Sequence, residues 1–262
     1  MHFDEIDFNA LYKQQKEATT FKMKSQAAWD NKAASMNERV HDSIYNEQFL
    51  DLLNLSGCKT VLDVGCGVGN LSLRLGTQLQ TVYALDYSSK MLSLLEENAK
   101  EKKLNNINPI NYSWYDDWSS IPKADIVLAS RSLEVKDMKE ALTKLHNHAK
   151  KRVYLSYKVG GTFVSQAILD VMQREVIKKP DYIYVMNILY SMGITASVNF
   201  IQSEGRSSVY KNCEHFIQSI AWSLGELTNT EKQRLEAYYE SDVKNNKHSS
   251  DFVSWAVISW EV

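Results

Sequence analysis

The chain has 262 residues, 44% of them hydrophobic, and a formal net charge of −2. This length supports one large core with an elaboration rather than two independent domains, and the near-neutral charge disfavours a broad nucleic-acid-binding face. No apolar run reaches the ~18–20 residues of a membrane span, and the cysteines, Cys58, Cys66 and Cys213, lack metal-ligand spacing. We therefore expect a cytoplasmic protein with reduced thiols, no bound metal and no membrane partner.

The first 42 residues are predicted to form an N-terminal helical flap. Residues 9–28 are polar and suited to a helix, but their apolar side chains are too sparse for a deep core face: Phe8, Leu11, Tyr12 and Phe21. Residues 43–55 then carry apolar side chains at helical spacing, and Gly57 ends that helix. We assign residues 43–262 to a single domain.

Short apolar strands and helices alternate through the middle of the chain. The expected strands are 60–64, 81–85, 106–112, 125–129 and 153–159, and the expected helices are 70–78, 89–103 and 137–149. Such alternation requires right-handed crossovers and gives a parallel sheet with helices on both faces. The strands are continuous apolar runs, as in a sheet that is covered on both sides.

A glycine-rich turn follows the first strand in the block VLDVGCGVGN. Gly65, Gly67 and Gly69 leave one face of the turn without Cβ atoms, so that a ligand can approach the backbone. The dinucleotide fingerprint needs a glycine where this chain has Asn70, and Asp63 would repel a pyrophosphate. The turn therefore favours a cationic or zwitterionic ligand such as S-adenosylmethionine.

The second strand also ends in an acid, Asp86, 23 positions after Asp63. A carboxylate at this point of a βαβ unit contacts ribose hydroxyls. Its alternative role is to cap the next helix, but Ser88 and Ser89 are better caps and leave Asp86 available.

The ordered blocks VLDVGCGVGN, ALDYSSKML and ADIVLASRSL resemble the class I S-adenosylmethionine-dependent methyltransferases over residues 29–160. The resemblance implies that Asp63 orients the methionine amino end and that Gly65, Gly67 and Gly69 cradle the methionyl part. It implies that Asp86 holds the ribose and Tyr87 packs on adenine. Cys66, within the turn, is expected to be a small apolar filler beside the cofactor.

Three further positions are assigned through the resemblance. The family's acid for the adenine edge corresponds to Ser113, followed by Trp114, unless the register is shifted and Asp116 or Asp117 takes that role. Ser130 and Arg131 correspond to positions beside the transferable methyl group. Trp29 lies in a stretch that folds over the cofactor in small-molecule enzymes of the family, or it anchors the flap on the sheet edge.

The C-terminal part departs from strict alternation after Gly161. We expect a helix at 165–178 and an inserted cap at about 162–195, whose tyrosines either line an acceptor pocket or pack in the core: Tyr182, Tyr184 and Tyr190. Strands at 197–202 and 252–260 and helices at 213–224 and 230–243 complete the chain. The resemblance implies a Rossmann-like α/β fold with seven mostly parallel strands and an antiparallel C-terminal pair.

Arg131 is the candidate catalytic residue. A charge directly after a buried strand suits a carboxylate of the acceptor or of the cofactor, and the alternative is an ion pair with Glu134 or Asp137. The histidines of the His146–His148 pair are two residues apart on a helix and so lie on different faces, which disfavours a metal site. No spacing singles out a general base among the candidates His41, Glu134, Tyr182 and His215.

We therefore predict a methyltransferase that uses S-adenosyl-L-methionine, releases S-adenosyl-L-homocysteine and acts on a small-molecule substrate. Residues 130–133 lack the Pro-Pro-aromatic and Pro-Cys patterns of base-modifying enzymes, so a nucleic-acid partner is disfavoured. The alternatives are a tRNA or protein methyltransferase and a cofactor-binding protein without turnover. Asn70 disfavours a nicotinamide oxidoreductase, and a homodimer is compatible with the sequence.

Overall fold

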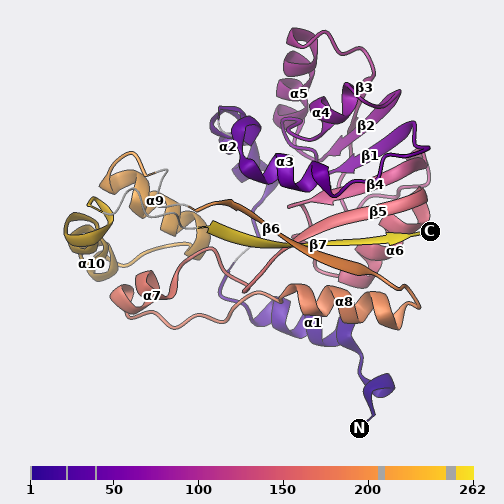
Figure 1. The fold of residues 1–262 in the computed structure, drawn as a ribbon. Coiled ribbons are helices and arrows are strands. Elements are labelled where there is room, and N and C mark those ends of the chain that lie inside the picture. Colours follow the sequence, from indigo (N-terminus) through magenta and orange to yellow (C-terminus); the bar gives the residue numbers. More distant parts are fainter. Residues whose placement is uncertain (1, 22, 39, 206–209, 246–251) are drawn as a thin grey trace.

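The computed structural model describes residues 2–21, 23–38, 40–205, 210–245 and 252–262, and a seven-stranded sheet organises them (Figure 1). The strand order is β3-β2-β1-β4-β5-β7-β6. Strands β1 to β5 pair in parallel, and β7 runs antiparallel to both β5 and β6. The expected Rossmann-like sheet with an antiparallel C-terminal pair, β6 and β7, is confirmed. The strands are β1 (Thr60–Val64), β2 (Thr81–Asp86), β3 (Ile107–Asn111), β4 (Ala124–Ser130), β5 (Ala149–Lys158), β6 (Ser197–Glu204) and β7 (Phe252–Glu261).

Helices cover both faces of the sheet. One face packs against α1 (Phe8–Ala18), α6 (Met138–His148) and α8 (Tyr182–Ser191), and the other against α3 (Ile44–Asp51), α4 (Ser72–Gly76) and α5 (Ser89–Glu101). The central strands are buried on both sides, since Val61, Leu62 and Val64 are fully shielded from solvent. This double burial explains why the central strands β1 and β4 are nearly continuous apolar runs rather than alternating ones.

The two helices of the N-terminal segment, α1 and α2 (Gln26–Asn37), pack at different places on the molecule. Tyr12 of α1 is fully buried, and its hydroxyl donates to the Val135 carbonyl at 2.8 Å. The expectation that this segment lacks a deep core face is therefore wrong, because one large side chain with a polar partner anchors it. Helix α2 packs instead on α5, above the glycine turn.

The aromatic helix α8 belongs to the sheet rather than to a cap. Val185, Ile188 and Leu189 are fully buried in the main core. Tyr184 packs edge-on against Tyr12, and Tyr190 is 64% exposed. Core packing on the sheet thus accounts for this helix, in line with the second alternative weighed for its tyrosines.

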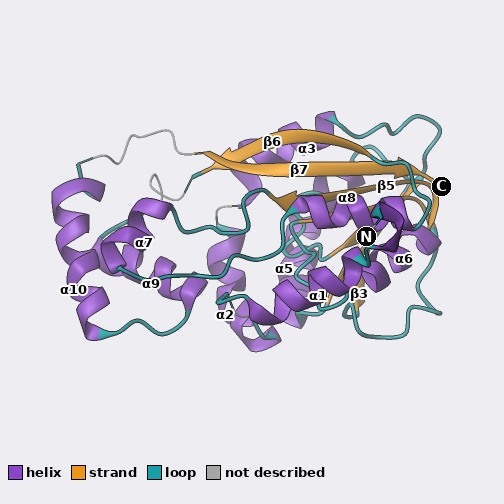
Figure 2. Ribbon diagram, turned by 90° about the horizontal axis from the view of Figure 1, so that it is seen from below, coloured by secondary structure: helices purple, strands orange, loops and turns teal. Residues whose placement is uncertain are grey.

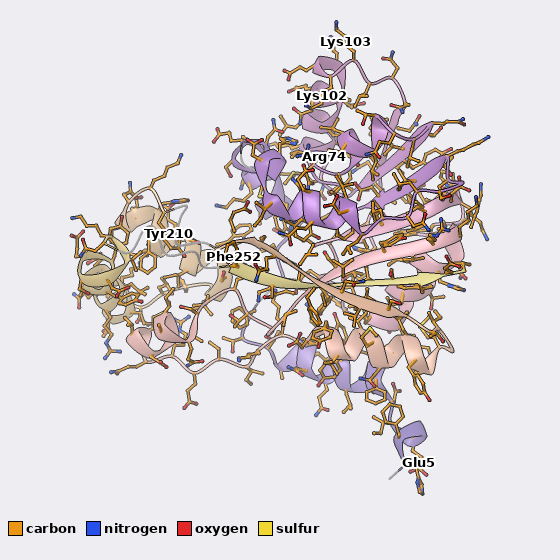
Figure 3. The ribbon with its side chains drawn as sticks, in the orientation of Figure 1. Glu5, Arg74, Lys102, Lys103, Tyr210 and Phe252 are labelled. Carbon is orange, nitrogen blue, oxygen red and sulfur yellow. The ribbon has the colours of Figure 1, made fainter. Side chains whose placement is uncertain are left out.

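A separate helical cap lies beside the sheet and has its own apolar cluster (Figure 2). It comprises α7 (Gln166–Met172), α9 (Cys213–Leu224), α10 (Asn229–Tyr238) and the π-helical turn η4 (Tyr239–Val243). Figure 3 places Tyr210 within this cap and Phe252 at the end of β7 that faces it. The helix expected at 165–178 ends early, because Gln173 adopts a left-handed conformation with φ of 56°.

Two short 3₁₀ turns complete the described structure, η1 (Phe3–Glu5) and η2 (Val40–Asp42). None of the helices in the described ranges has the length and apolar character of a membrane-spanning segment.

Candidate functional site

The glycine turn joins the end of β1 to α4 and is held against β2. The backbone N–H groups of Gly65 and Cys66 both donate to the Leu85 carbonyl, at 2.7 and 3.0 Å. Gly65, Gly67 and Gly69 all have positive φ angles, of 73°, 56° and 90°. Only glycine adopts this run of left-handed conformations without strain, which explains the spacing.

The three glycines have different surroundings. A Cβ on Gly65 would lie 2.3 Å from the Ser132 Cβ, and one on Gly69 would lie 2.1 Å from the Leu95 Cδ1. A Cβ on Gly67 would meet nothing within 4 Å. Protein side chains therefore lie against Gly65 and Gly69. Of the three glycines, Gly67 is the one whose backbone is open to a ligand.

Cys66 points into the protein beneath the turn. Its side chain is 2% exposed and packs in an apolar cluster with Leu73, Ala84 and Leu95. Burial raises the pKa of its thiol well above the usual value, and the carboxylates of Asp86 and Asp63 raise it further. Because such a thiol stays protonated, Cys66 acts as a filler rather than as a nucleophile.

Asp86 at the end of β2 joins the turn to the next helix. Its Oδ2 accepts the Gly67 N–H and its Oδ1 accepts the Ser88 N–H, both at 2.9 Å. Ser88 caps α5 by accepting the Met91 N–H, as the sequence predicts. Each carboxylate oxygen of Asp86 retains acceptor capacity for a further donor beside the exposed backbone of Gly67.

Asp63 at the end of β1 is the second buried carboxylate. It is 2% exposed, and its Oδ2 accepts the Ser72 hydroxyl at 2.6 Å. Burial raises its pKa to about 6, and the nearby charge of Asp86 contributes to the increase. In the described ranges no lysine, arginine or histidine pairs with Asp63 or Asp86. Two adjacent buried carboxylates without a cation favour a positively charged ligand.

Helix α2 places an aromatic side chain over this region. The Trp29 indole lies beside the Tyr87 hydroxyl, and burial and the Asp86 charge raise the pKa of that hydroxyl to about 12. The hydroxyl of Ser88 donates to Asp30 at 2.5 Å. Trp29 also meets Trp222 of α9 edge to face, with 5.6 Å between the ring centroids. Trp29 therefore links α2 to Trp222 of α9 and to Tyr87 after β2, and its role toward the cofactor stays a prediction.

The loop after β3 brings Ser113 and Asp116 into one turn. Asp116 Oδ2 accepts the Ser113 N–H at 2.7 Å, whereas Asp117 bonds to Ser119. The Trp114 indole donates to the Ser132 carbonyl at 3.1 Å, next to the residue that approaches Gly65. This turn adjoins the site through Trp114 and holds Ser113 and Asp116 in direct hydrogen-bond contact.

Arg131 follows β4 in a left-handed backbone conformation, with φ of 56°. Its guanidinium lies over the Tyr45 ring, 4.1 Å from the centroid, and its backbone N–H donates to Ser156 Oγ at 2.9 Å. The Tyr45 hydroxyl in turn bonds to Ser130 and Ser156, at 2.8 and 2.5 Å. Burial lowers the pKa of Arg131.

The proposed alternative partners of Arg131 are bound elsewhere. Glu134 forms ion pairs with Lys16 and Lys179, and Asp137 pairs with Lys13. The alternative that Arg131 forms an ion pair with Glu134 or Asp137 is therefore wrong.

The candidate general bases are also engaged. Burial raises the pKa of Glu134, but Lys179 and Lys16 outweigh it and hold the pKa below the usual value. His41 Nε2 contacts Asn37 between α2 and α5, and His215 Nδ1 accepts the Lys211 N–H in the cap. Tyr182 packs edge-on against Phe200 on the sheet. None of these four faces the Arg131–Tyr45 pair in the described contacts.

Three contributors to the site lacked a sequence signal or had a weak one. Tyr45 counted only as an apolar helix position, because its partners come from strands far along the chain. Asp30 was one of many charges in a polar helix. Ser72 had a usable signal, since it begins the helix that follows the glycine turn.

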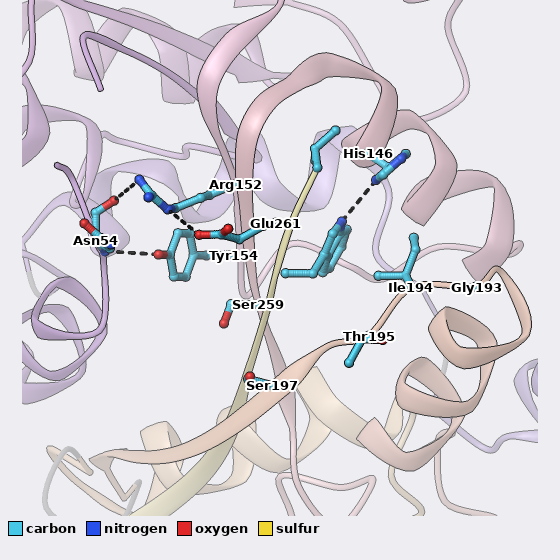
Figure 4. A pocket seen from close by; sticks show the side chains of 12 residues that line it. Asn54, His146, Arg152, Tyr154, Gly193, Ile194, Thr195, Ser197, Ser259 and Glu261 are labelled. Atoms are coloured by element: carbon cyan, nitrogen blue, oxygen red, sulfur yellow. Dashed lines mark hydrogen bonds and ion pairs between the residues drawn. The ribbon is translucent and has the colours of Figure 1, made fainter. Parts of the chain in front are cut away.

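A surface pocket lies at the opposite end of the sheet (Figure 4). Arg152 there pairs with Glu261 and donates to the Asn54 carbonyl, and the Trp260 indole donates to His146. These contacts are structural, and none of the predicted site residues lines this pocket.

The arrangement at the glycine turn fits S-adenosylmethionine. Gly67 opens onto free space, Asp63 and Asp86 offer buried negative charge, and Tyr87 directly follows Asp86 with Trp29 beside it. The sulfonium and amino group carry positive charge, and the ribose supplies hydroxyl donors for Asp86.

Comparisons with known proteins agree with this geometry. A family model described as a methyltransferase domain matches residues 61–152. An uncharacterized protein of Haemophilus influenzae is 39% identical over 261 residues, which cover 98% of this chain and 97% of that protein.

Two solved structures share the fold. Magnesium protoporphyrin IX methyltransferase from Synechocystis, with bound S-adenosylhomocysteine, superposes with a TM-score of 0.51 at 15% identity, over 92% of this chain and 89% of that one. Phosphoethanolamine N-methyltransferase 2 from Haemonchus contortus superposes with a TM-score of 0.53 at 17% identity, over 92% of this chain and 60% of that one.

Proposed function

The chain belongs to the class I S-adenosylmethionine-dependent methyltransferases, and from this premise we propose that it transfers the methyl group to a small-molecule acceptor in the cytoplasm. The observation that carries the proposal is the cradle after β1 and β2. There the free space beside Gly67 lies next to two buried carboxylates that lack a cationic partner in the described part of the chain. The three unpaired cysteines support a reducing compartment.

Each site residue is assigned to one part of the cofactor. Asp63 faces the positively charged amino end, Asp86 accepts the ribose hydroxyls, and Tyr87 packs on the adenine. The backbone of Gly67 forms the open floor, and Gly65, Cys66 and Gly69 shape the turn that presents it. Ser113 and Trp114 close the adenine end, Ser130 lies on the methyl side, and Trp29 covers the cofactor from α2.

The bound cofactor supplies an activated methyl group, so that in-line displacement needs little covalent help from the protein. The protein contributes alignment and exclusion of water. Trp29 and Asp30 hold α2 over the turn, and the contact of Trp29 with Trp222 joins this helix to the cap. Loops at the carboxyl ends of the strands are where ligands bind in this class of sheet.

The engaged state of the candidate bases supports an acceptor that reacts without one. Glu134 is held ionised by two lysines, and His41 and His215 lie in other contacts. A thiolate or a free amine needs no protein base, whereas a hydroxyl does.

Labelling tests the proposal. The purified protein is incubated with methyl-labelled S-adenosylmethionine and a cell extract that has been separated into low-mass, RNA and protein fractions. Label in the low-mass fraction supports a small-molecule acceptor, whereas label in RNA or protein would identify a macromolecular substrate. Cofactor binding without label in any fraction would identify a binding protein without turnover.

A further inference from the structure

Arg131 is an arginine whose charge has no partner among the described residues. Its guanidinium contacts the face of Tyr45, and no described carboxylate lies within ion-pair distance of it. Burial lowers the pKa of Arg131 and the charge of Glu204 acts against this shift, but the Glu204 carboxylate is engaged elsewhere. It caps α3 by accepting hydrogen bonds from the Ser43 hydroxyl and the Ile44 N–H, at 2.6 and 2.7 Å. A partly buried cation without a counterion is costly unless a ligand supplies one.

The contact with Tyr45 leaves the hydrogen-bonding edge of the guanidinium available. The five N–H donors of arginine lie in the guanidinium plane, while the aromatic ring contacts its face. The Tyr45 ring is fixed through its hydroxyl by Ser130 and Ser156. A planar, oriented fork of donors matches the geometry of a carboxylate.

The backbone shows that this orientation is imposed by the fold. Left-handed φ at a residue other than glycine is energetically unfavourable and is concentrated at functional sites. At Arg131 the conformation is held by the bond from its N–H to Ser156 Oγ, on the neighbouring strand β5.

The position of Arg131 in the sheet separates it from the cofactor residues. The strand order reverses between β1 and β4, so the residues after β1, β2 and β3 lie on one side of the switch point. Arg131 follows β4 and bonds to β5 on the other side. An aromatic path leads outward from it, because Trp255 meets Tyr45 at 5.6 Å and Phe163, 37% exposed, meets Trp255 at 5.7 Å.

We propose that Arg131, positioned by Tyr45, Ser130 and Ser156, binds a carboxylate of the methyl acceptor, so that the acceptor is a small carboxylic acid with an apolar body. This inference rests on the proposed methyl transfer and narrows its substrate class.

Benzoate is a suitable probe, with benzamide as its uncharged counterpart. Each is titrated by calorimetry into protein saturated with S-adenosylhomocysteine, using wild type, Arg131→Gln and the control Arg152→Gln at the opposite end of the sheet. We expect saturable benzoate binding in wild type and Arg152→Gln, at least about tenfold weaker binding in Arg131→Gln, and no binding of benzamide. The affinity for S-adenosylhomocysteine should stay within about twofold in all three proteins.

Absence of benzoate binding in wild type, or equal binding in Arg131→Gln, would overturn the proposal. A loss of S-adenosylhomocysteine affinity in Arg131→Gln with benzoate binding unchanged would assign Arg131 to the cofactor instead.

A second measurement uses the natural acceptor. The low-mass extract is separated on an anion-exchange resin, and each fraction is assayed with methyl-labelled cofactor. Acceptor activity retained by the resin supports a carboxylic acid, and activity only in the unretained fraction contradicts it. If no fraction accepts label, the proposed methyl transfer fails, while the benzoate titration still decides the role of Arg131.

Discussion

Asp86 shows how one carboxylate serves both the turn and a ligand. It accepts backbone N–H groups from Gly67 and Ser88, which fixes the turn, and it retains acceptor capacity toward the free space beside Gly67. Asp125 is a structural counterpart at the opposite end of the sheet, where its Oδ2 accepts the N–H groups of Lys59 and Thr60. The two acids therefore form a matched pair for testing function against structure.

Replacing Asp86 by Asn should weaken S-adenosylhomocysteine binding by ~1–3 kcal/mol, because a charge-assisted hydrogen bond to the ribose is lost. Calorimetric dissociation constants measure the effect. Asp125→Asn should leave the affinity unchanged. Equal affinities for wild type and Asp86→Asn would show that this acid only shapes the turn.

Gly67 allows a steric test of the same surface. Gly67→Ala should remain folded, because its new Cβ meets no protein atom within 4 Å, yet it should lose cofactor affinity. Gly193→Ala is the control, since Gly193 also has positive φ and open surroundings but lies after α8. Both variants should lose about 1–2 kcal/mol of stability from the left-handed Cβ. Tight binding by Gly67→Ala would place the cofactor elsewhere.

The raised pKa of Asp63 predicts a pH dependence of cofactor binding. The ionised carboxylate attracts the positively charged amino end, so affinity should be constant above pH 7 and fall as Asp63 takes up a proton below about pH 6. Dissociation constants of S-adenosylhomocysteine between pH 5 and pH 8 test this. Asp63→Asn should bind weakly, and the step near pH 6 should disappear.

The same shift has an opposite effect on the stability of the free protein. The folded state holds the Asp63 proton more tightly than the unfolded chain does. The contribution of Asp63 to the free energy of unfolding therefore falls as the pH rises from the ordinary pKa of an aspartate toward about 6. The melting temperature of ligand-free Asp63→Asn should therefore exceed that of wild type at pH 7.5. A lower value would mean that the folded protein already stabilises this charge.

At the residue scale, the parts of the site that lie within one turn could be predicted from the sequence. Asp63, the glycines and Asp86 are close in sequence to the backbone that they shape. The stacking of Arg131 on Tyr45 could not be predicted, because it depends on α3, β4 and β5 meeting in three dimensions.

At the element scale, α2 joins the glycine turn to the cap. Its N-terminal turns contact Ser88 and Tyr87 on one side and Trp222 of α9 on the other. Lys24 and Lys32 also lie over the Trp222 ring, at 5.0 and 5.1 Å from its centroid. The Trp222 ring is thus the main aromatic contact between α2 and the cap in the described structure.

Trp222→Ala should speed the release of bound cofactor by roughly 3–10-fold, because an aromatic pair contributes ~0.5–1.5 kcal/mol beyond its buried area. The release rate of methyl-labelled S-adenosylmethionine measures this. Phe3→Ala removes another edge-on aromatic contact, with Tyr190, and serves as the control. Unchanged release in Trp222→Ala would show that α2 stays in place without the cap.

Strands were easier to predict than helices from this sequence. Double burial makes the central parallel strands β1 and β4 apolar runs with clear limits. Helices α7 and α8 both carry apolar side chains, and only the packing shows that α7 joins the cap while α8 covers the sheet. The early end of α7 at Gln173 left no glycine or proline signal at that position.

At the scale of the whole molecule, the sheet order places the proposed cofactor and acceptor groups on two sides of one switch point. The carboxylates and glycines follow β1 and β2, Arg131 follows β4, and the cap is linked to this end through α2. The cap is stabilised by the ion pair between Arg174 and Glu231, whose carboxylate also caps α10 through Thr228.

Titration calorimetry of the wild-type protein with S-adenosylmethionine, S-adenosylhomocysteine and NADH tests the central claim most directly. If the backbone at Gly67 and the carboxylates of Asp63 and Asp86 hold the S-adenosyl nucleoside, S-adenosylmethionine and S-adenosylhomocysteine should both bind saturably and NADH should not. Saturable binding of NADH, with no heat from either S-adenosyl compound, would contradict the account.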